Sequence, residues 1–268
     1  MAEAHNLRRR RLRFLRRRRQ RKVDAAMTVV EHLSELRTRL IVSLGAFAAI
    51  SVAAFFFYEP LLELLTRPLC SLPRARLGPQ GCRLVFTQPL EAFFFRLKMT
   101  ALAGVAVSSP VWLYEVYAFV LPALTPKEKR YASPFLACSI ALFAAGTAVA
   151  YLTLSRGLGF LIGLGGEGLV PLLAAEAYLN FVGLMLLGFG VTFELPLLLI
   201  FLGLAGAVSV DSLRRQRKAA FVGIFVIAAV VTPSQDPYTM SVLALPLYGL
   251  YEVTIVVLAR LLRRRTAS

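Results

Sequence analysis

One carboxyl side chain stands far inside an apolar segment of the sequence. Glu194 lies in the stretch G-F-G-V-T-F-E-L-P, about 11 residues from the end of an apolar run over 177–205, or roughly 17 Å at 1.5 Å per residue. An ionised, unpaired carboxylate at that depth in a bilayer would be strongly destabilising. We therefore expect Glu194 to be protonated, to face a polar concavity or to be hydrogen-bonded to a neighbour. We assign Thr192 and Pro196 to the same polar site, and Pro196 also frees a backbone carbonyl and allows a bend. A neutral glutamate that only fixes helix packing is the structural alternative.

Other acidic side chains have simple structural explanations. Glu115 and Glu252 fall within the cytoplasmic third of their apolar runs, where each can reach the interface or form an internal bond. Glu35 is followed at i+4 by Arg39, an order that favours a surface ion pair worth a few tenths of a kcal/mol. Glu128 lies among basic residues on a short loop, where a solvated charge is the usual explanation.

The sequence contains no motif typical of catalysis or of metal binding. We find no G-x-x-x-x-G-K-[ST], no H-E-x-x-H and no G-x-S-x-G. His5 and His32 are the only histidines, and they share no ligand spacing. Of the three cysteines, only Cys70 and Cys82 share a polar loop, so the sequence permits at most one optional disulfide and supports no zinc cluster. We expect no cofactor, no metal and no enzymatic activity.

The composition places the chain in a membrane. Hydrophobic residues make up 57% of it and the mean hydropathy is +0.66, which is far too apolar for a soluble domain. A net charge of +16 is typical of nucleic-acid-binding proteins, yet 11 of the 31 basic residues fall between Arg8 and Lys22, outside the apolar body. The charge therefore indicates topology and contact with anionic lipid, and no nucleic-acid partner is expected.

The basic N-terminal segment predicts an arm without a fold of its own. Residues 1–26 are expected to be disordered and cytoplasmic, because a block of like charge repels itself and buries no apolar surface. No long apolar run follows it directly, so we do not expect a cleaved signal peptide. A start at Met27, just before the apolar body, is an alternative explanation of the arm. We assign 27–262 to a membrane domain and 263–268 to a cytoplasmic tail.

Six apolar runs predict an all-α integral membrane protein with both termini on the cytoplasmic side. In that orientation 24 of the 31 Lys and Arg residues lie in cytoplasmic segments, as the positive-inside rule requires. An amphipathic interfacial helix over 29–40, with Leu33, Leu36 and Leu40 on one stripe, is expected to enter the first span. The six runs cover 40–58, 92–121, 132–154, 177–205, 219–231 and 239–259.

The last two predicted spans are short. The run over 219–231 has 13 residues, about 20 Å of helix against a hydrocarbon core of about 30 Å. The sixth offers only 240–251 before Glu252, with Pro246 inside. Local thinning of the membrane would accommodate this pair, and extension of both helices into polar flanks is the alternative. The turn between them, T-P-S-Q-D-P, contains Asp236 as a further polar candidate.

Four separated motifs resemble one known family. They are H-L-S-E-L-R-T-R-L at 32–40, Y-E-V-Y-A-F-V-L-P-A-L-T-P-K-E-K-R at 114–130, F-G-V-T-F-E-L-P at 189–196, and the short helices around T-P-S-Q-D-P. In this order, from about Val29 to Leu262, they resemble TatC, the receptor subunit of the twin-arginine protein translocase. The arginine-rich arm departs from the family pattern, and so does the first outer loop, where R-A-R-L-G-P-Q-G-C looks like an insertion and Cys70 and Cys82 form an extra cysteine pair.

The resemblance implies a cupped six-span receptor that binds the paired arginines of a folded cargo's signal peptide at its cytoplasmic face. It assigns recognition to Glu35 and Glu128, whose carboxylates can each take two parallel hydrogen bonds from a guanidinium. Arg37 and Arg39 would orient these acids. Glu194 corresponds to the family's buried glutamate, in a polar dent of the concave face. Export across the cytoplasmic membrane would be driven by the proton gradient, with single-span TatA- and TatB-type partners and further copies of this chain in the complex.

The main rival hypothesis is a six-span, proton-coupled secondary transporter that uses Glu194 as its proton or substrate site. Such transporters often contain inverted repeats, and none is visible between the two halves of this sequence. The sequence therefore favours the translocase receptor.

Overall fold

The computed structural model describes residues 29–73, 77, 81–120, 132–165, 171–233 and 236–266. The predicted arm over 1–26 and the side chain of Glu128 lie outside these ranges. Two compact units divide the chain, residues 1–41 and residues 42–268.

Helices occupy all six apolar runs, so the all-α prediction is confirmed. The first run lies in α2 (Val29–Phe56), and the predicted interfacial helix is the first part of α2 rather than a separate element. The other runs form α5 (Glu91–Val107) and α6 (Ser109–Val120), α8 (Ala132–Gly163), α9 (Ala175–Thr192) and α10 (Leu195–Leu204), α12 (Arg217–Val231), and α13 (Pro237–Thr266). Two further helices, α3 (Tyr58–Cys70) and α11 (Val210–Arg215), lie between runs.

Four of the described helical segments are long and apolar enough to cross a membrane: His32–Phe56, Ser133–Gly163, Ala175–Leu204 and Pro237–Arg263. A fifth is the pair α5 and α6, if the two count as one span, because they are bent by 54° at Ser108. The predicted short fifth helix is confirmed, since the 15 residues of α12 measure about 22 Å.

The last helix is longer than predicted. α13 runs for 30 residues, and Pro246 lies inside it without ending it. The predicted run ends where the apolar residues end, because it was defined by hydropathy. The helix itself continues through Arg260 and Arg263, because its backbone hydrogen bonds do not depend on apolar side chains. Basic side chains are favourable at that end because they face the negative pole of the helix dipole. For α13 the alternative of extension into a polar flank is therefore the correct one.

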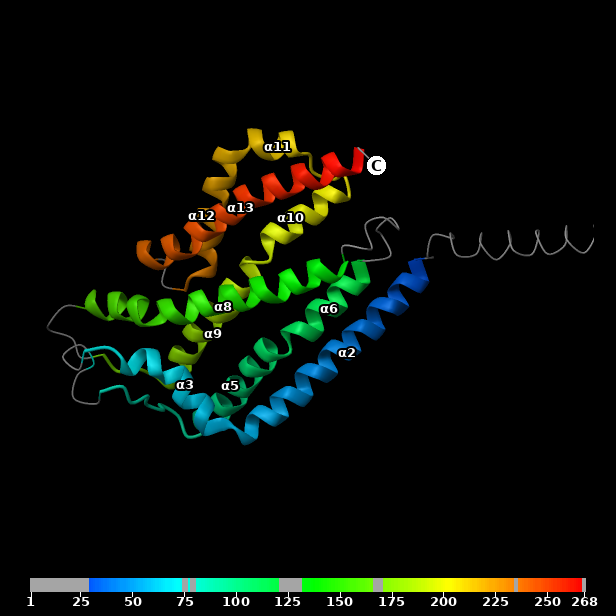
Figure 1. The fold of residues 1–268 in the computed structure, drawn as a ribbon. Helices are drawn as coiled ribbons and strands as arrows, with labels where there is room; N and C mark the ends of the chain where they lie inside the picture. The colour runs from blue at the N-terminus through cyan, green and yellow to red at the C-terminus, as the bar shows by residue number, and fades with distance from the viewer. Residues whose placement is uncertain are drawn as a thin grey trace, which may run out of the picture. The chain divides into compact units, whose positions relative to one another are not determined.

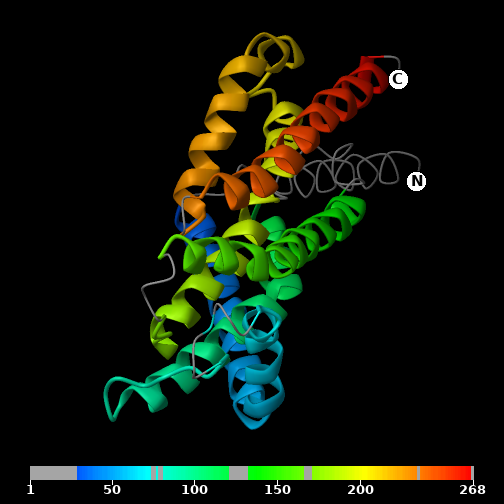
Figure 2. The same cartoon turned by 90° about the vertical axis from the view of Figure 1, so that its left-hand side faces the viewer.

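α8 and α9 cross closely because small residues face the opposite helix. A Cβ atom at Gly146 would lie 2.6 Å from the Phe189 carbonyl oxygen, and one at Gly190 would lie 2.8 Å from the Phe143 ring. Both distances are shorter than real contacts, so only glycine permits the crossing. Within the unit 42–268, α8 lies between the group α10 to α13 and the group α3, α5 and α6, with α9 crossing it (Figures 1 and 2).

Candidate functional site

A glutamate and a serine from different helices meet in the apolar part of the molecule. Glu194 lies in the two-residue break between α9 and α10, and Ser139 lies on α8. The Ser139 hydroxyl donates a hydrogen bond of 2.7 Å to Glu194 Oε2. Glu194 Oε1 is shielded from solvent and has no hydrogen-bond partner among the described residues. One carboxyl oxygen is therefore satisfied within the described part of the chain, and the other is not.

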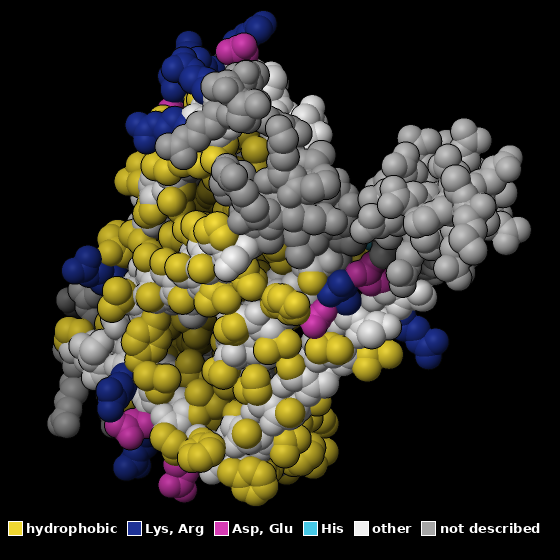
Figure 3. Space-filling view, turned by 45° about the vertical axis from the view of Figure 1, so that its right-hand side comes forward, with side chains coloured by type: hydrophobic (Ala, Val, Ile, Leu, Met, Phe, Trp, Pro, Cys, Tyr) yellow, Lys and Arg dark blue, Asp and Glu magenta, His cyan; other side chains and the backbone are white. Residues whose placement is uncertain are grey.

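An apolar groove of about 290 Å³ opens beside this pair. Its lining comes from α6, α8, α9 and α10 and is mostly hydrophobic. Trp112 forms part of one wall, where its Nε1 donates to the Val105 carbonyl at 3.1 Å and its indole packs edge-on against Phe143 with 5.4 Å between ring centroids. Hydrophobic side chains dominate the face shown in Figure 3, and the visible charged side chains lie mostly around its edge. A groove of this character can receive an apolar helix that carries a hydrogen-bond donor.

The structure does not bring Thr192 to the Glu194 carboxyl group. Thr192 is buried, and its hydroxyl donates to the Gly188 carbonyl of its own helix at 2.6 Å. Pro196 is the second residue of α10, where its missing N–H leaves no helical hydrogen bond unmade. Its carbonyl accepts from the Thr254 hydroxyl at 3.2 Å, which ties α10 to α13. Pro196 thus contacts α13 and not the Glu194 carboxyl group. The hydrogen bond to Glu194 that was expected from Thr192 comes from Ser139 instead.

Glu35 and Arg39 form an ion pair on α2. Glu35 Oε1 accepts a hydrogen bond of 3.1 Å from Arg39 Nε and a second bond from Arg39 Nη2. Both side chains are about four-fifths shielded, with 19% of Glu35 and 24% of Arg39 exposed. Glu35 Oε2 is shielded without a hydrogen-bond partner in the described residues. Arg37, by contrast, is exposed. The predicted i to i+4 pair is therefore present, and it leaves the second carboxylate oxygen shielded and without a hydrogen bond from the described residues.

Two further acidic candidates, Glu252 and Asp236, are hydrogen-bonded to neighbouring residues. Glu252 Oε2 accepts from Arg217 Nη2 at 2.8 Å, and Glu252 Oε1 accepts from the Tyr248 hydroxyl at 3.2 Å. Asp236 is buried and caps the start of α13, where its Oδ1 accepts from the Thr239 backbone N–H at 2.8 Å. These contacts give Glu252 and Asp236 structural roles. Glu115 is half-buried on α6.

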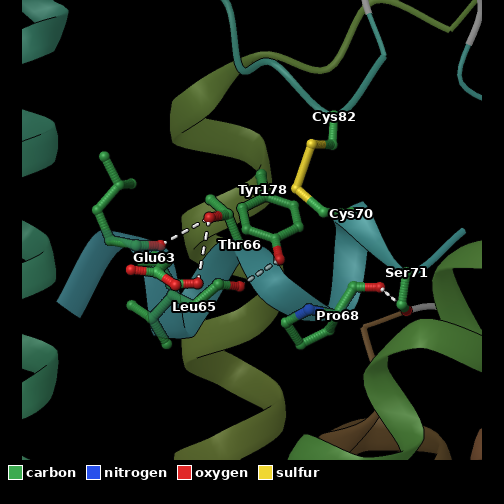
Figure 4. The surroundings of a disulfide bond; sticks show 9 residues. Glu63, Leu65, Thr66, Pro68, Cys70, Ser71, Cys82 and Tyr178 are labelled. Carbon is green, nitrogen blue, oxygen red and sulfur yellow. Dashed lines mark hydrogen bonds between the residues drawn. A yellow bond between two sulfur atoms is a disulfide. The ribbon is translucent and has the colours of Figure 1, made fainter. Parts of the chain in front are cut away.

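A compact cap lies at the end of the unit 42–268 that carries the cysteines; it consists of α3, residues 81–90 and residues 171–174. The disulfide that the sequence left open is present between Cys70 and Cys82 (Figure 4). Beneath it the Tyr178 hydroxyl of α9 donates to the Leu65 carbonyl of α3 at 2.6 Å. The backbone of Val85 pairs with Ala174 and so joins two loops that are distant in sequence.

Glu91 holds the cap to two helices, a role that the sequence analysis missed. Its Oε2 accepts from the Thr87 N–H at 2.5 Å, the Thr87 hydroxyl at 2.9 Å and the Gln88 N–H at 3.2 Å. Its Oε1 accepts from the Glu176 N–H at 3.3 Å. The Glu91 carboxylate thus accepts hydrogen bonds from the loop that precedes α5 and from a backbone N–H in the first turn of α9. The usual helix-start pattern did not mark this contact, because Thr87 lies four residues before Glu91 and the capping pattern has a spacing of three.

Comparison with known proteins decides the family. The chain matches the family model described as Sec-independent protein translocase protein (TatC) over residues 31–246. This chain belongs to the TatC family. It is 48% identical over 240 residues to TatC of Frankia casuarinae, covering 87% of this chain and 66% of that protein. It is 40% identical over 227 residues to TatC of Desulforapulum autotrophicum, covering 84% and 82% of the two chains. A crystal structure of the twin-arginine translocase receptor TatC in DDM is 37% identical, with a TM-score of 0.71 over 85% of this chain and 99% of that chain.

The TatC match covers most of the candidate residues. Glu35, Glu115, Glu194 and Asp236 lie within residues 31–246, and Glu252 lies beyond them. The chain spans 66% and 61% of the length of the Frankia and Corynebacterium relatives. Among the described residues of this TatC-family chain, no group of three or more His, Cys, Asp and Glu side chains is arranged to hold a metal ion. Two of these carboxylates, Glu35 and Glu194, each keep one shielded oxygen that no described residue hydrogen-bonds, and an apolar groove lies beside Glu194.

Proposed function

We propose that this chain is the receptor and core subunit of a twin-arginine translocase in the cytoplasmic membrane. It binds the paired arginines in the signal peptides of folded cargo proteins, and the proton gradient drives export through a complex with TatA- and TatB-type subunits. Membership of the TatC family supports this proposal, as does 37% identity to a protein described as the twin-arginine translocase receptor.

The Glu35 carboxylate is the observation that carries the proposal. Its Oε1 already accepts two hydrogen bonds from the guanidinium of Arg39, so the group is placed to bind arginine. Its Oε2 has no hydrogen-bond partner among the described residues. A guanidinium presents five N–H donors in a planar fork, and an incoming arginine can bond to Oε2 while Arg39 keeps Oε1. A lysine ammonium presents no such planar fork of donors. In this proposal Glu128 supplies the second carboxylate.

Glu194 serves in this proposal as a polar anchor in the membrane. Its Oε1 lacks a partner in the described residues and stands beside the apolar groove of about 290 Å³. A signal-peptide or partner helix lying in the groove would complete the hydrogen bonding of Glu194 by offering one donor. The Glu35 carboxylate suits the charged end of a signal peptide, and the groove beside Glu194 suits its apolar core.

The disulfide supports an orientation with both termini in the cytoplasm. Disulfides persist in oxidising compartments, so the end of the protein that carries Cys70–Cys82 belongs outside the cytoplasm. The spanning segment Ala175–Leu204 leads from that cap to α11 and α12, where Arg214, Arg215, Arg217 and Lys218 cluster. A basic cluster at the opposite end agrees with the positive-inside rule.

Crosslinking of a signal peptide tests the proposal. We would place a photo-crosslinker at Leu36, which is exposed beside Glu35, and add a twin-arginine signal peptide to membranes that contain the full chain. Glu35→Ala should reduce crosslinking by about tenfold, and a Lys-Lys signal should do the same in the wild-type protein. Glu63→Ala removes an exposed, paired glutamate from the cap and is the matched control, which should have no effect. Wild-type crosslinking and export by both Glu35→Ala and Glu128→Ala would show that carboxylate recognition is wrong.

A further inference from the structure

We propose that a pocket beside α3, α8 and α13 binds the phosphodiester headgroup of a membrane phospholipid. The pocket has a volume of about 490 Å³ and lies at the end of the molecule that carries the disulfide. Its polar lining comes from Ser71 of the α3 terminus, Ser155 and Arg156 of α8, and Tyr238 of α13. Three segments that are far apart in sequence therefore supply one guanidinium and three hydroxyls to the same cavity.

The hydrogen bonding in this pocket leaves donors for an anion. Arg156 Nη1 donates to the Tyr238 hydroxyl oxygen at 3.0 Å, which holds the guanidinium in place and leaves the Tyr238 hydrogen unused. Ser71 Oγ lies 2.8 Å from the Pro68 carbonyl, as Figure 4 shows, and 2.9 Å from Ser155 Oγ. These two contacts use the hydroxyl hydrogens of both serines, so the donors left for an anion come from the Arg156 guanidinium and the Tyr238 hydroxyl. A phosphate group, which only accepts hydrogen bonds at its oxygens, matches such a set of donors.

The charge of the pocket is not neutralised within the described part of the chain. No carboxylate lines the pocket, and no described acidic side chain forms an ion pair with Arg156. Three other described basic residues of the unit 42–268 are paired, Arg67 with Glu63, Lys98 with Glu176, and Arg217 with Glu252. Arg156 therefore presents a positive charge in a cavity to which the described residues contribute no carboxylate, which favours an anionic ligand.

The depth of Arg156 along α8 points to a lipid as the source of that anion. Residues 135–154 contain no charged side chain, and these 20 residues measure about 30 Å, the thickness of the hydrocarbon core. Arg156 follows two positions later, at the level of the lipid phosphates. On the same stripe of α8, Leu152, Ala148 and Ala145 are exposed toward the middle of the span. A headgroup on Arg156 would place an acyl chain along this stripe.

Native mass spectrometry of the full, delipidated chain in detergent tests the proposal by titration with dioleoylphosphatidylglycerol. Arg156→Gln should weaken binding of the tightest lipid by about fivefold, the effect of one arginine beside a lipid phosphate. Arg67→Gln is the matched control, because Arg67 is also exposed in the cap region but is paired with Glu63, and it should bind lipid as the wild type does. Tyr238→Phe keeps the ring and removes the oxygen that positions Arg156, so it should also weaken binding.

Two further titrations identify the source of the phosphate. Dioleoylglycerol has the same acyl chains without the phosphate and should bind at least fivefold more weakly than the phospholipid. Inorganic phosphate at equal concentration should not displace the phospholipid, because it lacks the acyl chains. Equal binding of dioleoylglycerol, equal binding by Arg156→Gln and wild type, or displacement by inorganic phosphate would each overturn the assignment.

Discussion

Two carboxylates in the unit 42–268 differ in how completely the protein satisfies them. Glu91 is 8% exposed and accepts four hydrogen bonds, three of them from backbone N–H groups. Glu194 accepts one hydrogen bond, from Ser139, and its other oxygen has no partner among the described residues. A carboxylate whose oxygens are all bonded internally holds structure together, whereas one left incomplete is available to another molecule. The difference separates a structural acid from a candidate binding acid.

The surroundings of the two acids reinforce this difference. The cap that Glu91 fastens is also closed by the Cys70–Cys82 bond and by the Val85–Ala174 backbone pair. The groove at Glu194 has no crosslink, and its walls are helices that contact mainly through hydrophobic side chains. We therefore expect changes in the cap to reduce stability, and changes in the groove to reduce assembly with a second helix.

The largest effect is expected from Glu91→Ala. Its loss would leave the donors of Thr87, Gln88 and Glu176 without an acceptor, so we expect the unfolding temperature in detergent to fall by roughly 10 °C. Glu176→Ala is the matched control, because it removes only the exposed pair with Lys98, and it should lower the unfolding temperature by about 2 °C or less. Equal shifts in the two variants would contradict the structural role of Glu91.

Removal of the disulfide should have the next largest effect. The bond closes a loop with a sequence separation of 12, and a loop of that size contributes about 3 kcal/mol to the free energy of unfolding. We expect the double variant Cys70→Ser, Cys82→Ser to lose that amount, and the reduced wild type to unfold at the same denaturant concentration as the variant. Cys138→Ser, which changes the free exposed cysteine, should be neutral. A wild type that does not respond to reductant would show that the bond adds nothing to stability.

The helix crossing that brings Ser139 to Glu194 can be tested at Gly146. Gly146→Ala places a Cβ within 2.6 Å of the Phe189 carbonyl and should destabilise the protein by about 1 to 3 kcal/mol. It should also weaken assembly, because α8 would move away from α9. Gly163→Ala lies in the same helix with nothing within 4 Å of the new atom, and it should be neutral. Denaturation in detergent gives the free energy of unfolding of each variant. Similar losses of stability in Gly146→Ala and Gly163→Ala would argue against a close crossing.

The sequence predicted the helical segments better than their ends. Apolar runs mark helices because a spanning backbone must satisfy its own hydrogen bonds, and every run is helical in the structure. The long end of α13 was not predicted, since hydropathy does not register a helix that continues into a polar flank. α3 was missed as well, although Leu61, Leu65 and Leu69 recur at the spacing of one helical face.

The candidate site was predicted only in part, because its contacts join distant residues. Glu194 was identifiable as a carboxyl group deep in an apolar run, and the pair of Glu35 with Arg39 follows from their spacing. The partner of Glu194 was not identifiable, since Ser139 is 55 residues away and meets it only through the crossing of α8 and α9. Thr192 is closer in sequence but bonds to its own helix, as a threonine within a helix commonly does.

The smallest expected effect on folding, and the most informative for function, concerns Glu194. Glu194→Gln keeps the volume and the hydrogen-bonding capacity of the side chain and removes its ionisation, whereas Glu194→Leu removes both polar functions. If Glu194 is a polar anchor, Gln should be mild and Leu should weaken assembly with a partner helix by about 1 to 2 kcal/mol for each lost hydrogen bond. Ser139→Ala is the companion variant, because it removes the only hydrogen bond that the described residues give this carboxyl group.

Two measurements on the same membranes separate the outcomes for Glu194. Crosslinking to the single-span partner reports assembly, and export of a folded reporter reports transport. If Glu194 is a polar anchor, crosslinking and export should both fall in Glu194→Leu and should both stay near the wild-type level in Glu194→Gln. A proton carrier predicts instead that both variants assemble but neither exports, because Gln cannot titrate. If Glu194→Leu crosslinks and exports like the wild type, Glu194 is a buried acid without a role in assembly or transport. The difference between Glu194 and Glu91 would then reflect only how each side chain is packed.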